Sequence, residues 1–266
     1  MYLYISVLSM LLACKSQTEI DLLTQKTKEN PLKGKTQAII VSDAAGNKIT
    51  TEWVYDATTK QIIGSKITDS LAKNINNETF KRDTDGKMLS IAIERKAADG
   101  TKTQSEKVYQ YEGSKLISIT ENLNSEQLID EYGYDSEGKL IKYTRSSTNR
   151  GMRSTLQIIN YTWKGGNIVN RADRSLSGGY EEEDFQYNAG ENVLAKFYKE
   201  ELKINNLSLE IISQNLPASS VRLFEGSRFK YEYEYNQSNM IIGYKILISK
   251  SGIWQTYKQF KITYYE

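Results

Sequence analysis

Residues 131–143 read EYGYDSEGKLIKY, and this stretch decides the fold. Tyr132 and Tyr134 alternate with polar residues, as expected for a strand that has one buried and one solvated face. Asp135 and Gly138 then favour a turn, because Asp accepts hydrogen bonds from backbone N–H groups ahead of it and Gly adopts positive φ. A second apolar strand starts at Leu140. The stretch therefore predicts a β-hairpin.

The same unit recurs along most of the chain. The residue before each turn repeats at intervals of 23 to 29 residues, with one double interval of 48. These residues are Tyr55, Arg82, Tyr111, Tyr134, Trp163, Tyr187 and Tyr235. Consecutive hairpins with short turns form an antiparallel meander rather than a parallel β-helix. We therefore expect an all-β fold, an antiparallel meander of repeated hairpins that forms a large curved sheet or an open barrel.

One segment near residues 190–215 interrupts the repeat. Residues 193–202 have apolar side chains at helical spacing, residues 207–212 continue this pattern, and Pro217 would end it. We expect a helical or irregular insertion that lies on the open face of the sheet. Two further strands are the alternative.

The N-terminus has the features of an export signal. Residues 2–13 form a nearly uncharged apolar run of 12 residues, which is shorter than the roughly 20 residues of a membrane-spanning helix and typical of a signal peptide. The run ends in Leu11-Leu12-Ala13-Cys14, which resembles the lipobox of bacterial lipoproteins. Residues 1–4 lack the usual Lys or Arg, which leaves open whether Met1 is the true start.

This resemblance implies a domain organisation. Signal peptidase would cleave before Cys14, and the thiol of Cys14 would carry diacylglycerol. Residues 1–13 would then be the lipoprotein signal peptide, residues 14–35 the lipidated N-terminus and tether, and residues 36–266 the β domain. The membrane is thus an expected partner, through the lipid on Cys14.

The hairpin unit resembles the YD repeat of the RHS family, whose consensus is Tyr-x-Tyr-Asp-x-x-Gly-x-Leu. Residues 132–140 match it closely. The order of lipobox, hairpins, insertion and final Tyr-x-Tyr hairpin is also similar to a family of uncharacterised Bacteroidota lipoproteins. The resemblance covers roughly residues 38–266 and implies a β-rich shell or curved sheet, with no known activity.

The composition excludes several kinds of chemistry. The chain has no His and a single Cys, Cys14, so it lacks imidazole bases, Ser/His/Asp triads and His or Cys metal sites. Its 35 basic and 33 acidic residues are mixed along the chain, without the basic stripe that nucleic-acid binding requires. We expect no cofactor and no nucleic-acid partner.

Two groups of acidic residues are candidate sites. The turns at 83–86 and 135–138 have the oxygens of a Ca²⁺ loop, but hairpin turns need the same residues. Residues 181–184 read EEED, and paired carboxylates are what glycoside hydrolysis requires. In a strand, however, Glu181 and Glu183 point to one face and Glu182 and Asp184 to the other. This favours a solvated edge strand that resists aggregation.

The aromatic residues are the candidate ligand-binding set, although packing in the core is the default for each of them. They are Tyr132, Tyr134, Trp163, Tyr231 and Tyr233. We expect a non-catalytic cell-envelope lipoprotein that binds or scaffolds, with a glycan or another envelope protein as partner. A glycan-active protein is an alternative and needs two carboxyl groups about 5 to 9.5 Å apart in a cleft. A carrier of an apolar ligand in the cup of the sheet is another, and needs a dry apolar pocket.

The expected location is the outer membrane. Surface-export signals of Bacteroidota place acidic residues soon after the lipidated Cys, and residues 15–19, KSQTE, match this poorly. The periplasmic face is therefore favoured over the cell surface.

Overall fold

The computed structural model describes residues 35–176, 179–196, 198, 212–238, 240–249 and 251–265. Thr36–Thr263 form one compact unit. The expected signal peptide, Cys14 and all of the tether except Lys35 therefore lie outside the described residues.

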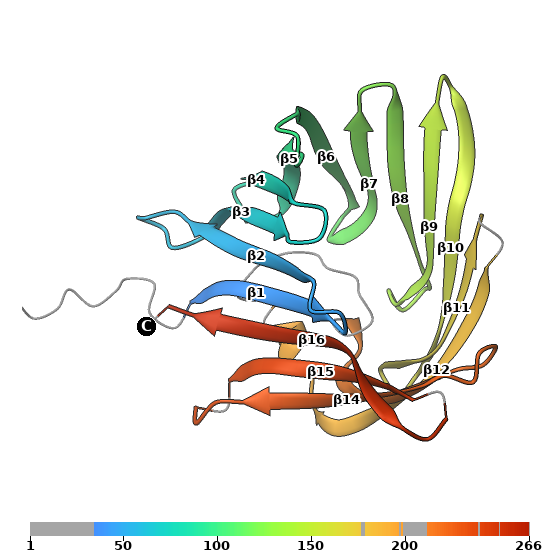
Figure 1. Cartoon of the computed structure of the whole chain (residues 1–266). Coiled ribbons are helices and arrows are strands. Elements are labelled where there is room, and N and C mark those ends of the chain that lie inside the picture. The colour runs from blue at the N-terminus through green and yellow to red at the C-terminus, as the bar shows by residue number, and fades with distance from the viewer. Residues whose placement is uncertain are drawn as a thin grey trace, which may run out of the picture. The chain divides into compact units, whose positions relative to one another are not determined.

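The compact unit consists almost entirely of strands (Figure 1). In chain order they are β1 (Thr36–Asp43), β2 (Lys48–Tyr55), β3 (Ile62–Asp69), β4 (Asn74–Arg82), β5 (Met88–Lys96), β6 (Lys102–Glu112), β7 (Lys115–Leu123), β8 (Glu126–Tyr134), β9 (Leu140–Asn149), β10 (Met152–Lys164), β11 (Asn167–Ser175), β12 (Tyr180–Glu191), β13 (Asn215–Arg222), β14 (Arg228–Tyr235), β15 (Ile241–Ser249) and β16 (Trp254–Tyr264).

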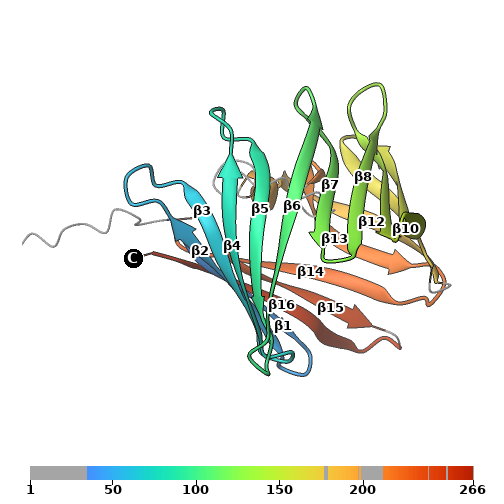
Figure 2. The same ribbon diagram turned by 90° about the horizontal axis from the view of Figure 1, so that it is seen from above.

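Each strand pairs with its neighbours in the sequence, and β1 also lies beside β16, so the sheet is a closed barrel. Figure 2 shows the hairpins following one another around it. The predicted all-β antiparallel meander is confirmed. The sequence predicted a curved sheet or an open barrel, whereas the barrel in the structure is closed. Closure leaves no edge strand with unpaired backbone groups, and it joins segments that are far apart in the sequence, as in the 3.4 Å hydrogen bond from Thr263 Oγ1 to the Ala38 carbonyl.

The turns of the repeat are built as their sequence predicts. After β8, the Asp135 carboxylate accepts hydrogen bonds from the backbone N–H groups of Glu137 at 2.9 Å and Lys139 at 2.8 Å. Gly138 has a φ of +81°. After β4, the Asp83 carboxylate accepts two backbone N–H groups in the same way. The Asp residues that a Ca²⁺ loop would have used therefore hold the turns.

A β-bulge follows each of these turns. Tyr134 pairs with Leu140 and Gly133 pairs with Lys142, so Ile141 bulges out between them. The same offset follows Tyr55, Arg82, Tyr111, Trp163 and Tyr235. In each of these hairpins the apolar residue that pairs with the residue before the turn is buried. These residues are Ile62, Met88, Leu116, Leu140, Ile168 and Ile241. The sequence repeat is thus a repeated packing unit.

Aromatic side chains also join several of the hairpins to the one before. The Tyr134 hydroxyl donates to the Leu116 carbonyl at 2.8 Å, and Trp163 Nε1 donates to the Leu140 carbonyl at 2.7 Å. Tyr187 bonds to Ile168 in the same way. The acceptor is in each case the backbone carbonyl of a buried residue in the preceding hairpin. The polar end of each ring thus has a hydrogen-bond partner while its apolar body packs in the core.

The outward face of the barrel is charged. Ion pairs on this face include Lys66–Glu52 at 3.7 Å and Lys245–Glu234 at 3.0 Å, with all four side chains at least one-third exposed. The residues that alternate with them, such as Trp53 and Tyr244, are buried. The barrel therefore has an interior core and a solvated exterior.

The insertion is described in part. α2 (Val193–Lys196) is a single helical turn, capped by Asn192, whose side-chain oxygen accepts the Ala195 N–H at 2.9 Å. Residues 199–211, on which the rest of the helical prediction falls, lie outside the described residues. Ile212 packs against the core cluster of Ile168 and Phe185. The insertion therefore contributes to the core of this part of the barrel.

Candidate ligand-binding cavity

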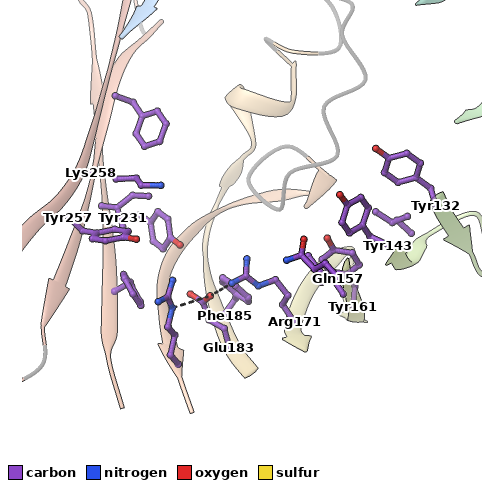
Figure 3. Close-up of a pocket in the computed structure, with 16 residues that line it drawn as sticks. Tyr132, Tyr143, Gln157, Tyr161, Arg171, Glu183, Phe185, Tyr231, Tyr257 and Lys258 are labelled. Atoms are coloured by element: carbon purple, nitrogen blue, oxygen red, sulfur yellow. Dashed lines mark hydrogen bonds and ion pairs between the residues drawn. The ribbon is translucent and has the colours of Figure 1, made fainter. Parts of the chain in front are cut away.

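A cavity of about 510 Å³ lies inside the barrel. Its lining comes from strands β8 to β16, which the barrel brings face to face. In Figure 3, Tyr132, Tyr143 and Tyr161 stand on one wall, with Tyr231 and Lys258 on the other. The described residues that line it are Tyr132, Leu140, Tyr143, Gln157, Ile159, Tyr161, Arg171, Glu183, Phe185, Arg222, Phe229, Tyr231, Ile246, Tyr257, Lys258 and Phe260.

The first wall consists of neutral tyrosines. The rings of Tyr132 and Tyr143 are cross-strand neighbours on β8 and β9, with centroids 5.7 Å apart. Burial raises the pKa of both phenols. The Tyr143 hydroxyl also donates to the Asp130 carboxylate at 2.7 Å, which raises its pKa further. Both groups therefore keep their protons and offer the cavity an aromatic surface with polar edges.

The region between the walls carries a charged network. Arg171 Nη2 lies 3.0 Å from Glu183 Oε2, and Arg222 Nε lies 2.6 Å from Glu181 Oε1. Ser220 also donates a hydrogen bond to Glu183. Arg222 stacks over the Phe229 ring, 4.7 Å from its centroid. Neighbouring strands β11, β12 and β13 supply these charges in register.

This network corrects the interpretation of residues 181–184. The predicted alternation is right, since Glu181 and Glu183 share one face. The solvated edge strand is wrong, because β12 is paired on both sides and Glu183 is only 5% exposed. The sequence showed four acidic residues but not the arginines on adjacent strands that pair with two of them.

The predicted ligand-binding residues fall into two groups. Tyr132 and Tyr231 line the cavity. Tyr134, Trp163 and Tyr233 donate hydrogen bonds to backbone carbonyls instead, with Tyr233 bonded to Pro217 at 2.9 Å. Their polar ends hold neighbouring hairpins together. Cys14, the predicted lipid attachment site, lies outside the described residues.

Sequence reasoning missed the polar members of the lining. Gln157, Arg171, Arg222 and Lys258 belong to no motif. The available signal was the alternation within each strand, because Arg222 and Lys258 share a face with apolar residues. That signal identifies a face but not which strands lie opposite one another.

The described residues offer neither a metal site nor a membrane helix. Among them, His, Cys, Asp and Glu nowhere gather in threes close enough to hold a metal ion. None of the helices within the described ranges has the length and apolar character needed to cross a membrane.

Comparison with known proteins gave similar structures only. Neither the family models nor the curated proteins include a match to this chain. A porin-like protein from Bacteroides uniformis ATCC 8492 is 8% identical, with 88% of this chain and 98% of that chain covered and a TM-score of 0.43. A porin-like protein from Bacteroides vulgatus ATCC 8482 is 13% identical, with 87% and 99% covered and a TM-score of 0.45. What this chain binds must therefore be inferred from its own cavity.

Proposed function

We propose that this chain is a non-catalytic binding protein of the cell envelope that holds a small ligand inside its barrel. The observation that carries the proposal is the cavity of about 510 Å³ between aromatic walls. Its volume falls within the roughly 300–1,000 Å³ typical of small-molecule sites. Apolar rings combined with a few fixed polar groups are the usual composition of such sites.

The charged network favours a polar ligand over an apolar one. Arg171, Glu183 and Arg222 form part of the lining. A bound lipid or other apolar molecule would remove water from these charged groups without forming hydrogen bonds to them, which costs free energy. A glycan fits better, because its hydroxyls can bond to such groups while its C–H faces pack on tyrosine rings.

The same network argues against glycoside hydrolysis. Glu181 and Glu183 lie on the same strand, and both are ion-paired with Arg171 and Arg222. A glycosidase instead places two carboxyl groups on opposite sides of the scissile bond. Glu183 is the only acidic residue among the described lining residues, which therefore include no opposed pair of carboxyl groups.

Binding can be tested by screening the purified protein on a glycan array and measuring hits by calorimetry. Tyr231→Ala removes a ring from the cavity wall, and Glu232→Ala changes its outward neighbour on β14. We expect the first variant to weaken binding about tenfold or more, the loss of roughly 1.4 kcal/mol, and the second to bind normally. Equal binding by both variants would place the ligand outside the barrel.

The proposed anchor needs a separate test in cells. We propose that Cys14 carries the lipid that holds the protein at the outer membrane, on the periplasmic face. Labelling with radioactive palmitate should mark the protein and fail with Cys14→Ala, and the variant should leave the membrane fraction. Protease added to intact cells should spare the protein, and its digestion would place it on the surface.

A further inference from the structure

We infer that the ligand is an acidic sugar, a ring that bears one carboxylate, and that Lys258 binds this carboxylate. The inference rests on the proposed function and names the ligand class of the same cavity. It follows from the distribution of charge over the described lining residues, which include three cations and one carboxylate.

Two of the three cationic side chains are already neutralised by ion pairs with glutamates. Arg171 Nη2 lies 3.0 Å from Glu183 and 3.5 Å from Glu181. Arg222 Nε lies 2.6 Å from Glu181 and 4.0 Å from Glu183. Two arginines and two glutamates thus form a network with no net charge, which positions polar groups without attracting an ion.

Lys258 is the remaining cation. It lies on β16, on the wall opposite Tyr132 and Tyr143 (Figure 3). Within the described ranges no carboxylate oxygen comes within the 4.0 Å that defines an ion pair with its Nζ, which lies over the Tyr257 ring at 5.5 Å from the centroid. An ammonium group without a counter-ion, facing a partly enclosed cavity, favours an anionic ligand.

The single positive charge of this ammonium group favours some anionic ligands over others. A single unpaired ammonium matches the single charge of a carboxylate. A phosphate carries up to two charges at neutral pH and would call for further unpaired cations, but both lining arginines are engaged. Tyrosine rings on both walls suit the C–H faces of a sugar ring, and Gln157 offers an amide to its hydroxyls.

The test is calorimetry with matched disaccharides, cellobiose and the form oxidised to a uronic acid at one C6, at low ionic strength. We expect the native chain to bind the acidic form about tenfold more tightly, the effect of one charge-assisted hydrogen bond. Lys258→Gln should abolish this preference, so that the variant binds the two sugars with equal affinity. Inorganic phosphate and acetate, titrated separately, should compete weakly or not at all.

Lys261→Gln is the matched control, because Lys261 lies on the same strand and faces outward. It should keep the full preference for the acid. Equal affinity for the two sugars, or a preference that survives Lys258→Gln, would overturn the inference and leave the proposed function standing. Tight binding of phosphate would show that Lys258 binds an anion other than a carboxylate, which would also overturn the inference. Failure to bind any sugar on the glycan array or in these titrations would overturn both proposals.

Discussion

Individual aromatic residues act here as connections between hairpins. Tyr134 donates its hydroxyl to the buried Leu116 carbonyl, and Trp163 repeats this contact one hairpin later. Several of the residues whose recurrence reveals the repeat therefore also hold its copies together. This explains why a ring with a polar end occupies the position where Phe would satisfy the hydrophobic requirement alone.

The Tyr134 contact can be measured by removing one oxygen. Tyr134→Phe should lower the free energy of unfolding by about 1 kcal/mol, because a buried carbonyl loses its partner. The control is Tyr235→Phe, since Tyr235 precedes a turn in the same way but its hydroxyl makes no hydrogen bond within the described part of the chain. Urea denaturation of both variants gives the comparison. An equal loss in the two would show that the hydroxyl of Tyr134 contributes nothing specific.

Glu121 makes stability depend on pH. It is bonded to Arg95 and Ser105 and lies 3.9 Å from Lys107. Burial alone would raise the pKa of its carboxyl, but these partners together hold the pKa below its ordinary value of 4.5. Because the folded-state pKa is the lower one, this stabilisation is present above about pH 4.5 and is lost as pH falls through the folded value.

Glu121→Gln should therefore lower stability at pH 7 by about 2 kcal/mol, since it leaves Arg95 without its counter-charge. The difference from the native chain should shrink as pH falls from 5 to 3. Thermal melting across this range provides the measurement. A constant difference would mean that the carboxyl titrates alike in the folded and unfolded chains.

At the scale of the element, the hairpin turn sets the register of the strands on either side. In the turn after β1, the Asp43 carboxylate accepts the N–H groups of Ala45 and Asn47, both at 2.9 Å. The side chain of Asn47 also bonds to it and, with these N–H groups, holds the pKa of Asp43 below its usual value. Gly46 completes the turn at a φ of +84°.

The effect of the positive φ at Gly46 on stability can be measured separately from the effect of side-chain crowding. A Cβ at Gly46 or at Gly190 would meet no atom within 4 Å, but Gly46 alone has a positive φ. Gly46→Ala should cost about 1 kcal/mol of folding stability, whereas Gly190→Ala should be neutral or slightly stabilising. Guanidinium unfolding midpoints would decide, and equal midpoints would contradict a conformational role for Gly46.

For the whole molecule, the charged exterior decides the solvent in which the barrel is stable. Ion pairs such as Glu94–Lys102 and Glu131–Arg153 lie on the outward face. A barrel that faces lipid instead has an apolar outer band, and desolvating these charges would be costly. We infer that this outer face is in contact with water.

It follows that residues 15–266, made without the apolar run of residues 2–13 and without Cys14, should fold in aqueous buffer free of detergent. The expected results are a β-type circular dichroism spectrum, a single elution peak and a cooperative melting transition. A requirement for detergent to prevent aggregation would show that the outward face is not water-exposed.

The sequence by itself determined the hairpin unit, its antiparallel pairing and which side chains of a regular strand share a face. These depend on contacts within a few residues, such as Asp135 with Lys139, and on period-2 alternation, so a local pattern records them. Alternation also separated Glu181 from Glu182 correctly. It could not show that Glu181 would meet Arg222, because that contact depends on which strand lies next to β12.

Only the tertiary structure decided that the meander closes, and closure created the cavity. β1 pairs with β16, and Tyr132 lies across the cavity from Lys258. Both arrangements bring together residues from distant repeats. Many similar hairpins could satisfy the same local rules in an open sheet. The number of strands and the curvature of the sheet set the interior space, and these are properties of the whole chain.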